Sequence, residues 1–148
     1  MNILISRNIF IVLLAVVFFS SCAKKEQPQM VIENVFIKAL APGQTTAAAY
    51  MKFKNNTSKA QSLTYIHSPI AEHIEVHRNF YEQGMMQMRP VKRFSIPPKG
   101  SHVLEPGGFH LMVFGLYDTL EVGDTFDMTF EFDSGIVMTK SVEVRPHG

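Results

Sequence analysis

An all-β fold, an antiparallel β-sandwich, is predicted from three observations in the 148-residue sequence. Its apolar segments are short and rich in β-branched and aromatic residues, which is typical of strands. Gly, Pro, Asn and Asp separate them, and the nine glycines and eight prolines suit turn positions. No long window repeats its apolar residues at the 3.6-residue period of an amphipathic helix. We therefore expect a single domain of about seven to nine strands.

The first residues read as an export signal that precedes the fold. Arg7 is followed by an uninterrupted apolar run, residues 9–19, and then by small residues. Such a run is too short to span a bilayer as a helix, and the layout is that of a secretory signal. We assign residues 1–21 to a lipoprotein-type signal peptide, residues 22–30 to a polar tether, and residues 31–148 to the folded domain.

Cys22 is the sole cysteine and directly follows Ser20 and Ser21 at the end of the apolar run. This arrangement resembles a bacterial lipobox, in which the cysteine is lipidated and becomes the mature N-terminus. The alternative is an ordinary signal peptide in which Cys22 has no role. Both interpretations place the protein in the cell envelope, on the periplasmic side. Lipidation would add a membrane anchor and leave no free thiol, which suits an oxidising compartment.

Eight segments of the domain have the composition and the flanking turn residues of strands. Residues 71–80 alternate clearly, with Ile74 and Val76 predicted to face the core and His73, Glu75 and His77 the other side. The sequence "DSG" after the seventh segment predicts a tight hairpin turn. The eight expected strands are 31–39, 47–55, 60–68, 71–80, 85–91, 109–116, 124–132 and 136–144.

Composition excludes several functions. The chain is 46% hydrophobic and 18% charged, so it can bury a core, and its formal net charge is +1. Residues 22–148 hold thirteen basic and thirteen acidic residues. This balance gives no broad basic surface, so we expect no nucleic-acid partner. The sequence contains neither a Ser/His/Asp order nor paired carboxylates in a recognisable setting. It therefore gives no indication of an enzyme.

Histidine and methionine share strand faces in a way that points to copper. His110 and Met112 alternate with Leu111 and Val113, so the first pair is expected on one face and the second in the core. Thioethers are soft ligands that select Cu(I), and imidazole suits copper in either oxidation state. The sequence lacks the Asp/Glu cluster that would indicate a Ca²⁺ or Mg²⁺ site. It also lacks the Cys/His spacing that would indicate structural zinc. Gly107 and Gly108, just before this strand, form either a simple turn or a special backbone conformation beside the site.

The spacing of four such residues makes the pattern specific. His77 is followed after ten residues by Met88, which is followed after twenty-one by His110 and then by Met112. With the flanking "EVH", "GMMQMRPV" and "EPGGFHLMVFGL", this resembles the PCu(A)C periplasmic copper chaperone family, over most of residues 31–145. The resemblance implies a cupredoxin-like sandwich that binds one Cu(I) through these four residues. It also implies a non-enzymatic carrier that passes copper to a recipient such as the dinuclear copper site of cytochrome c oxidase.

Other functions stay open at this stage. The domain could be an interaction module whose His and Met are incidental, or a protein of general periplasmic copper storage or tolerance. Blue-copper electron transfer uses a cysteine ligand, and the only cysteine lies at the tether. Among the remaining residues, Met86 matches no ligand position of the motif. The expected surface histidines are His67, His73 and His102, and the expected core methionines are Met51, Met128 and Met138.

Overall fold

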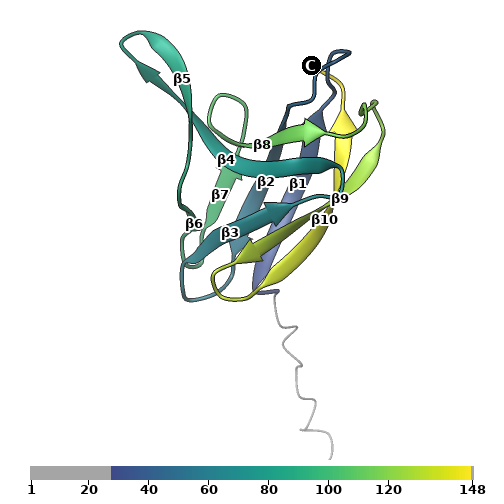
Figure 1. Ribbon diagram of the computed structural model, residues 1–148. Coiled ribbons are helices and arrows are strands. Elements are labelled where there is room, and N and C mark those ends of the chain that lie inside the picture. Colours follow the sequence, from purple (N-terminus) through teal and green to yellow (C-terminus); the bar gives the residue numbers. More distant parts are fainter. Residues whose placement is uncertain (1–27, 148) are drawn as a thin grey trace, which may run out of the picture.

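A computed structural model describes residues 28–147 of the chain. The predicted signal peptide, Cys22 and most of the tether lie outside these residues. Within the described part the structure is all β, with no helix long and apolar enough to cross a membrane. Ten strands run through it (Figure 1): β1 Met30–Lys38, β2 Ala47–Asn55, β3 Gln61–His67, β4 Ala71–Glu82, β5 Met85–Pro90, β6 Phe94–Ile96, β7 Ser101–Leu104, β8 Phe109–Leu116, β9 Thr125–Phe132 and β10 Val137–Arg145.

The strands form one continuous hydrogen-bonded sheet that folds back on itself. Its order is β5-β4-β8-β2-β1-β10-β9-β3-β6, and β7 also pairs with β2. The first residues of β2, Ala47–Ala49, pair with β8, whereas Met51–Lys54 pair with β7. A strand that exchanges partners along its length lets the network enclose a core. Among the described strands the pairing is antiparallel except between β1 and β10, which run parallel.

The core forms where the inward faces of these strands meet. Phe53 of β2 lies near its centre, with its ring centroid 5.7 Å from that of Phe94, 5.6 Å from Phe130 and 6.2 Å from Phe132. Leu111 and Val113 of β8 are fully buried, as their alternation predicted. Met51 and Met128 are buried and Met138 packs against the core at its margin, so the prediction for these methionines is confirmed.

The expected and observed strands agree closely at the segments that matter for the site. β2 and β8 have the predicted bounds, and β4 extends two residues further, to Glu82. The "DSG" turn is confirmed, since Gly135 has φ of 84° and its N–H donates to the Phe132 carbonyl at 2.9 Å. Met30, predicted as the end of the tether, is instead the buried first residue of β1. The short strands β6 and β7 were not predicted.

A tight hairpin joins β4 and β5 and projects from the body (Figure 1). Glu82 pairs with Met85, so only Gln83 and Gly84 form the turn. Their φ values are 52° and 78°, and two positive values are the mark of a type I′ turn, whose twist matches that of the flanking strands. The hairpin therefore continues β4 beyond the edge of the body.

One buried polar side chain ties together the opposite part of the fold. Asn55, at the end of β2, is fully buried. Its amide nitrogen lies 2.7, 3.2 and 3.1 Å from the carbonyl oxygens of Lys59, Ile96 and Pro97. Its amide oxygen accepts from both the N–H and the hydroxyl of Thr57, at 2.9 and 2.7 Å. Every polar atom of this side chain is hydrogen-bonded.

Candidate metal centre

Strand pairing places two of the predicted ligands directly opposite each other. In the antiparallel pair of β4 and β8, His77 pairs with His110, and Glu75 pairs with Met112. Because side chains alternate along each strand, all four lie on the same face of the sheet. The ring centroids of the two histidines are 6.2 Å apart. Both histidines are buried and Met112 is half-buried.

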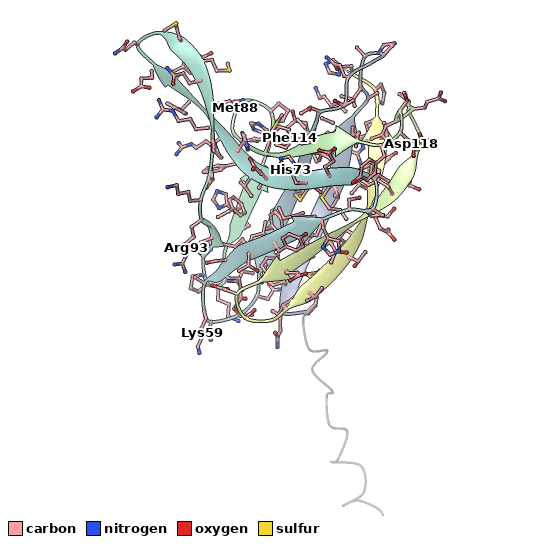
Figure 2. All side chains as sticks on the ribbon, in the orientation of Figure 1. Lys59, His73, Met88, Arg93, Phe114 and Asp118 are labelled. Atoms are coloured by element: carbon pink, nitrogen blue, oxygen red, sulfur yellow. The ribbon has the colours of Figure 1, made fainter. Side chains whose placement is uncertain are left out.

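Met88 joins this face from the hairpin. In the pairing of β4 with β5 it stands opposite Asn79, which lies on the same face of β4 as His77. Its sulfur Sδ lies 3.1 Å from Nε2 of His110. Figure 2 shows Met88 at the junction of the hairpin with the body. The structure thus brings His77, His110 and Met88 together, with Met112 on the same face two residues beyond His110.

The tautomer of His110 follows from its other ring nitrogen. Nδ1 lies 3.1 Å from the carbonyl oxygen of Gly108, and a carbonyl can only accept, so Nδ1 carries the proton. In the neutral ring Nε2 then presents its lone pair toward Sδ of Met88, which is itself only a weak acceptor. Two electron-rich atoms therefore lie 3.1 Å apart, an arrangement that a cation bound to both would stabilise.

The two glycines before β8, Gly107 and Gly108, hold the Gly108 carbonyl in position. Gly107 has φ of 81°, the region that glycine adopts without strain, and the Gly108 N–H donates to the Glu105 carbonyl at 3.0 Å. The Gly108 carbonyl also accepts from the N–H of Asn79, at 3.1 Å. The segment is thus a turn, and that turn also orients His110 through a backbone carbonyl. The two interpretations of the glycines are compatible.

His77 shows the complementary arrangement. Its Nε2 lies 2.8 Å from a carboxylate oxygen of Glu75, so Nε2 donates and Nδ1 is left with a lone pair. That Nδ1 is buried and has no hydrogen-bond partner among residues 28–147. Buried polar atoms are nearly always hydrogen-bonded, so an orphaned nitrogen on a ring that neighbours a second imidazole fits a metal ligand. Carboxylates that hold the other nitrogen of a ligating histidine are a common feature of metal sites.

The pKa of His110 is lowered from its usual range. Burial, which disfavours the charged ring, is the main cause, and the nearby His77 lowers it further, whereas the hydrogen bond to Gly108 raises it. The lower pKa keeps His110 neutral at physiological pH. Only a neutral imidazole can bind a metal, so burial prepares this ring for a ligand role.

The donor set here is soft. In the described part of the chain, no group of three or more His, Cys, Asp and Glu side chains could hold a metal ion. The other donors on this face are the thioethers of Met88 and Met112, and thioethers favour Cu(I). Glu75 and the Gly108 carbonyl were not predicted as parts of the site. The alternation of strand β4 did place Glu75 beside His77, and that was the available signal.

The remaining histidines lie elsewhere. His67 and His73 are exposed as predicted, and the His73 ring stacks on Phe114 with centroids 4.6 Å apart (Figure 2). The prediction for His102 was wrong. Its ring is half-buried against Phe94, with a centroid distance of 4.3 Å, and Nδ1 lies 3.1 Å from the Ser95 carbonyl. A turn nearby did not expose it because the short strand β6 packs over it.

Solved structures with the same fold define the class of domain. The copper-bound PCuAC domain from PmoF2 superposes with a TM-score of 0.68 at 20% identity, covering 80% of this chain and 94% of that one. The Cu(I) form of DR1885 from Deinococcus radiodurans matches with a TM-score of 0.66 at 26% identity, covering 84% and 83%. The fold is thus PCuAC-like, as the resemblance implied.

Sequence comparison gives the family. Residues 30–144 match the family described as "Putative lipoprotein LpqE-like", and the chain belongs to it. Among its relatives, "Putative lipoprotein Lxx21020" of Leifsonia xyli subsp. xyli is 29% identical over 122 residues, which cover 82% of this chain and 72% of that protein. Protein RP573 of Rickettsia prowazekii is 30% identical over 101 residues, 68% of this chain and 56% of its own length. The match thus spans little more than half of RP573.

Proposed function

We propose that the protein is an exported, non-enzymatic copper chaperone that binds one Cu(I) and passes it to a recipient. The ligands are His77, Met88, His110 and Met112. The observation that carries the proposal is the 3.1 Å approach of His110 Nε2 and Met88 Sδ, two atoms that both offer lone pairs. The copper-bound and Cu(I)-loaded structures of the same fold support it.

The donor set suits a carrier. Two neutral imidazoles and two thioethers hold Cu(I) without a charged thiolate, so the ion stays exchangeable. His77 and His110 are buried on paired strands, whereas Met88 is exposed. The rigid strands fix two ligands in advance, and the exposed thioether keeps the ion within reach of a partner.

Two groups position the ligands. Glu75 holds Nε2 of His77, which directs Nδ1 to the ion, and the Gly108 carbonyl holds Nδ1 of His110, which directs Nε2 to the ion. Such partners set the tautomer and orientation of a metal-binding histidine. Opposite tautomers of the two histidines thus follow from their neighbours.

The recipient and the anchor belong to the same proposal. A lipid on Cys22 would hold the domain at the periplasmic side of a membrane, and membership in a family of lipoproteins supports this. Copper passed on by the anchored domain could reach the copper site of cytochrome c oxidase, as the resemblance to the PCu(A)C chaperones implies.

An anaerobic Cu(I) titration against a chromophoric chelator tests the site. We expect one ion per protein, and a large loss of affinity in the double variant Met88→Leu, Met112→Leu, with the fold retained because Leu and Met have similar volumes. Met85→Leu, on the opposite face of β5, is the matched control and should bind as the wild type does.

Other outcomes separate the alternatives. Unchanged affinity in the double variant would contradict the ligand assignment. No Cu(I) binding at all would favour an interaction module with incidental His and Met, and a stoichiometry well above one would favour copper storage or tolerance.

A further inference from the structure

The β4–β5 hairpin exposes side chains that normally lie in a core. Tyr81 is 74% exposed, Met85 61%, Met86 56% and Met88 48%. Single exposed apolar residues are common, but four on one short hairpin are more than packing explains, and three of them, Tyr81, Met86 and Met88, share one face. Met88 already has a place in the proposed site. The other three raise the question of what the hairpin contacts.

The two faces of the hairpin differ in chemistry. On one face, Arg89 lies 3.1 Å from a carboxylate oxygen of Glu82 and 3.0 Å from the amide oxygen of Gln87, and its guanidinium stacks over Phe80 at 5.0 Å. Met85 shares this face by alternation. On this face, therefore, Arg89 is paired with a carboxylate, and Arg78, which stands opposite Arg89, lies over the Phe109 ring at 5.0 Å.

The other face carries thioethers and no charge. Met86 stands opposite Tyr81, and Met88 stands opposite Asn79, so these four side chains share the face that continues to His77. Met86 lies nearer the Gln83–Gly84 turn, and Met88 lies nearer the body. The order from the tip inward is therefore Met86, Met88 and then the buried His110.

The spacing lets one ion touch both thioethers. Residues two apart on a strand are about 6.6 Å apart, and methionine has three rotatable bonds and a polarizable sulfur. Both side chains are about half exposed, which leaves Met86 room to turn toward Met88. A pair of thioethers is a soft Cu(I) site of low charge.

We propose that Met86 is a transit ligand, which binds Cu(I) briefly during its exchange between a partner and the site; this inference rests on the proposed function. On entry, a Cu–ligand bond to the donor breaks as a Cu–S bond to Met86 forms. Met88 then binds as a further bond to the donor breaks, and the bond to Met86 gives way to bonds with His110, His77 and Met112. Copper remains Cu(I) throughout, and no proton or electron moves.

Stopped-flow transfer of Cu(I) between a chromophoric chelator and the purified full-length protein tests this role. In Met86→Leu we expect uptake and release both to slow about tenfold, a change of roughly 1.4 kcal/mol in the barrier. The equilibrium affinity should stay as in the wild type, because Met86 is not bound in the resting complex. Met85→Leu removes a thioether from the opposite face and should change neither rate.

Three results would overturn the inference. Wild-type rates in Met86→Leu together with slow rates in Met86→Ala would show that the side chain acts as an apolar contact and not as a ligand. A lower equilibrium affinity in Met86→Leu would make Met86 a resident ligand. If the protein takes up no Cu(I), the proposed function fails as well, whereas normal one-to-one binding with unchanged Met86→Leu rates overturns the transit role alone.

Discussion

Two buried polar side chains of this protein, Asn55 and His77, differ in whether their polar atoms are hydrogen-bonded. Asn55 is 0% exposed and all its polar atoms are hydrogen-bonded, so its burial ties β2 to the turn and to β6. His77 is 8% exposed, and one of its ring nitrogens has no partner among the described residues. Folding alone would disfavour the second arrangement. The contrast separates a polar group that serves stability from one that, as proposed, binds a metal ion.

The largest effect on stability is expected from removing the hydrogen bonds of Asn55. Asn55→Ala removes five hydrogen bonds at a fully buried position, among them the buried bond to the Ile96 carbonyl, so the free energy of unfolding should fall by about 3 kcal/mol. Urea denaturation measures this. Asn56→Ala removes a single exposed bond to the Pro28 carbonyl and should cost less than about 1 kcal/mol. Equal losses in the two variants would contradict the role given to Asn55.

The next effect concerns the carboxylate that leaves His77 Nδ1 free. Glu75→Gln keeps a hydrogen-bonding group but removes the charge that raises the basicity of the ring, so Cu(I) affinity should fall about tenfold. Competition with a chelator measures it. Glu72→Gln, on the same strand beside Gly115, is the control and should bind as the wild type does. A Glu75→Gln variant with wild-type affinity would remove Glu75 from the site.

A smaller effect of opposite sign is expected at His77 itself. His77→Phe removes the unpartnered buried nitrogen and keeps a ring near Phe114, 5.9 Å away between centroids. The free energy of unfolding should rise by about 1 kcal/mol, while Cu(I) binding is lost. His67→Phe, at an exposed position, should change stability by less than about 0.5 kcal/mol. A marked loss of stability in His77→Phe would mean that the ring serves the fold.

The smallest effect is a dependence of stability on pH, traced to His110. Its pKa is lower in the folded protein than in the unfolded chain, chiefly because of burial. As pH falls below about 6.5 the unfolded chain takes up the proton first, so the metal-free protein loses stability until the pH reaches the lowered folded pKa. Above that range the contribution is complete. Urea denaturation between about pH 5 and 8 measures it, and His110→Phe should weaken the slope; an unchanged slope would contradict the assignment.

The same proton competes with copper. Since the pKa of His110 is lowered, protons should compete with Cu(I) for this ring only below the usual histidine range. The Cu(I) affinity should therefore stay constant as the pH falls to that range and weaken at lower pH.

Sequence reasoning predicted the fold best where local patterns are long. β2 and β8 alternate over eight or nine residues between clear turn residues, and their bounds were predicted to the residue. β6 and β7 have three and four residues, too few to show any period, and they were missed. The parallel pairing of β1 with β10 joins the two ends of the domain, and no local pattern contains it.

The site divides in the same way. Alternation placed His110 and Met112 on one face and Leu111 and Val113 in the core, because a strand leaves no other choice. That His77 lies opposite His110 depends on the register of two strands about thirty residues apart in the chain, and the spacing motif only implied it. Which ring nitrogen is free depends on side-chain contacts with Glu75 and Gly108, which no sequence pattern encodes. The four-ligand set itself stays a prediction.

The start of β1 and the β4–β5 hairpin lie at opposite ends of the molecule. Figure 1 shows β1 beginning at one end of the body, with the β4–β5 hairpin projecting from the other. Met30 lies eight positions after Cys22, and a chain of that length reaches at most about 30 Å. With a lipid on Cys22, as proposed, the domain would stay close to its membrane while the hairpin points away from it. Copper exchange would then take place at the outer limit of the molecule, where a protein in solution or one standing in a facing membrane can meet it.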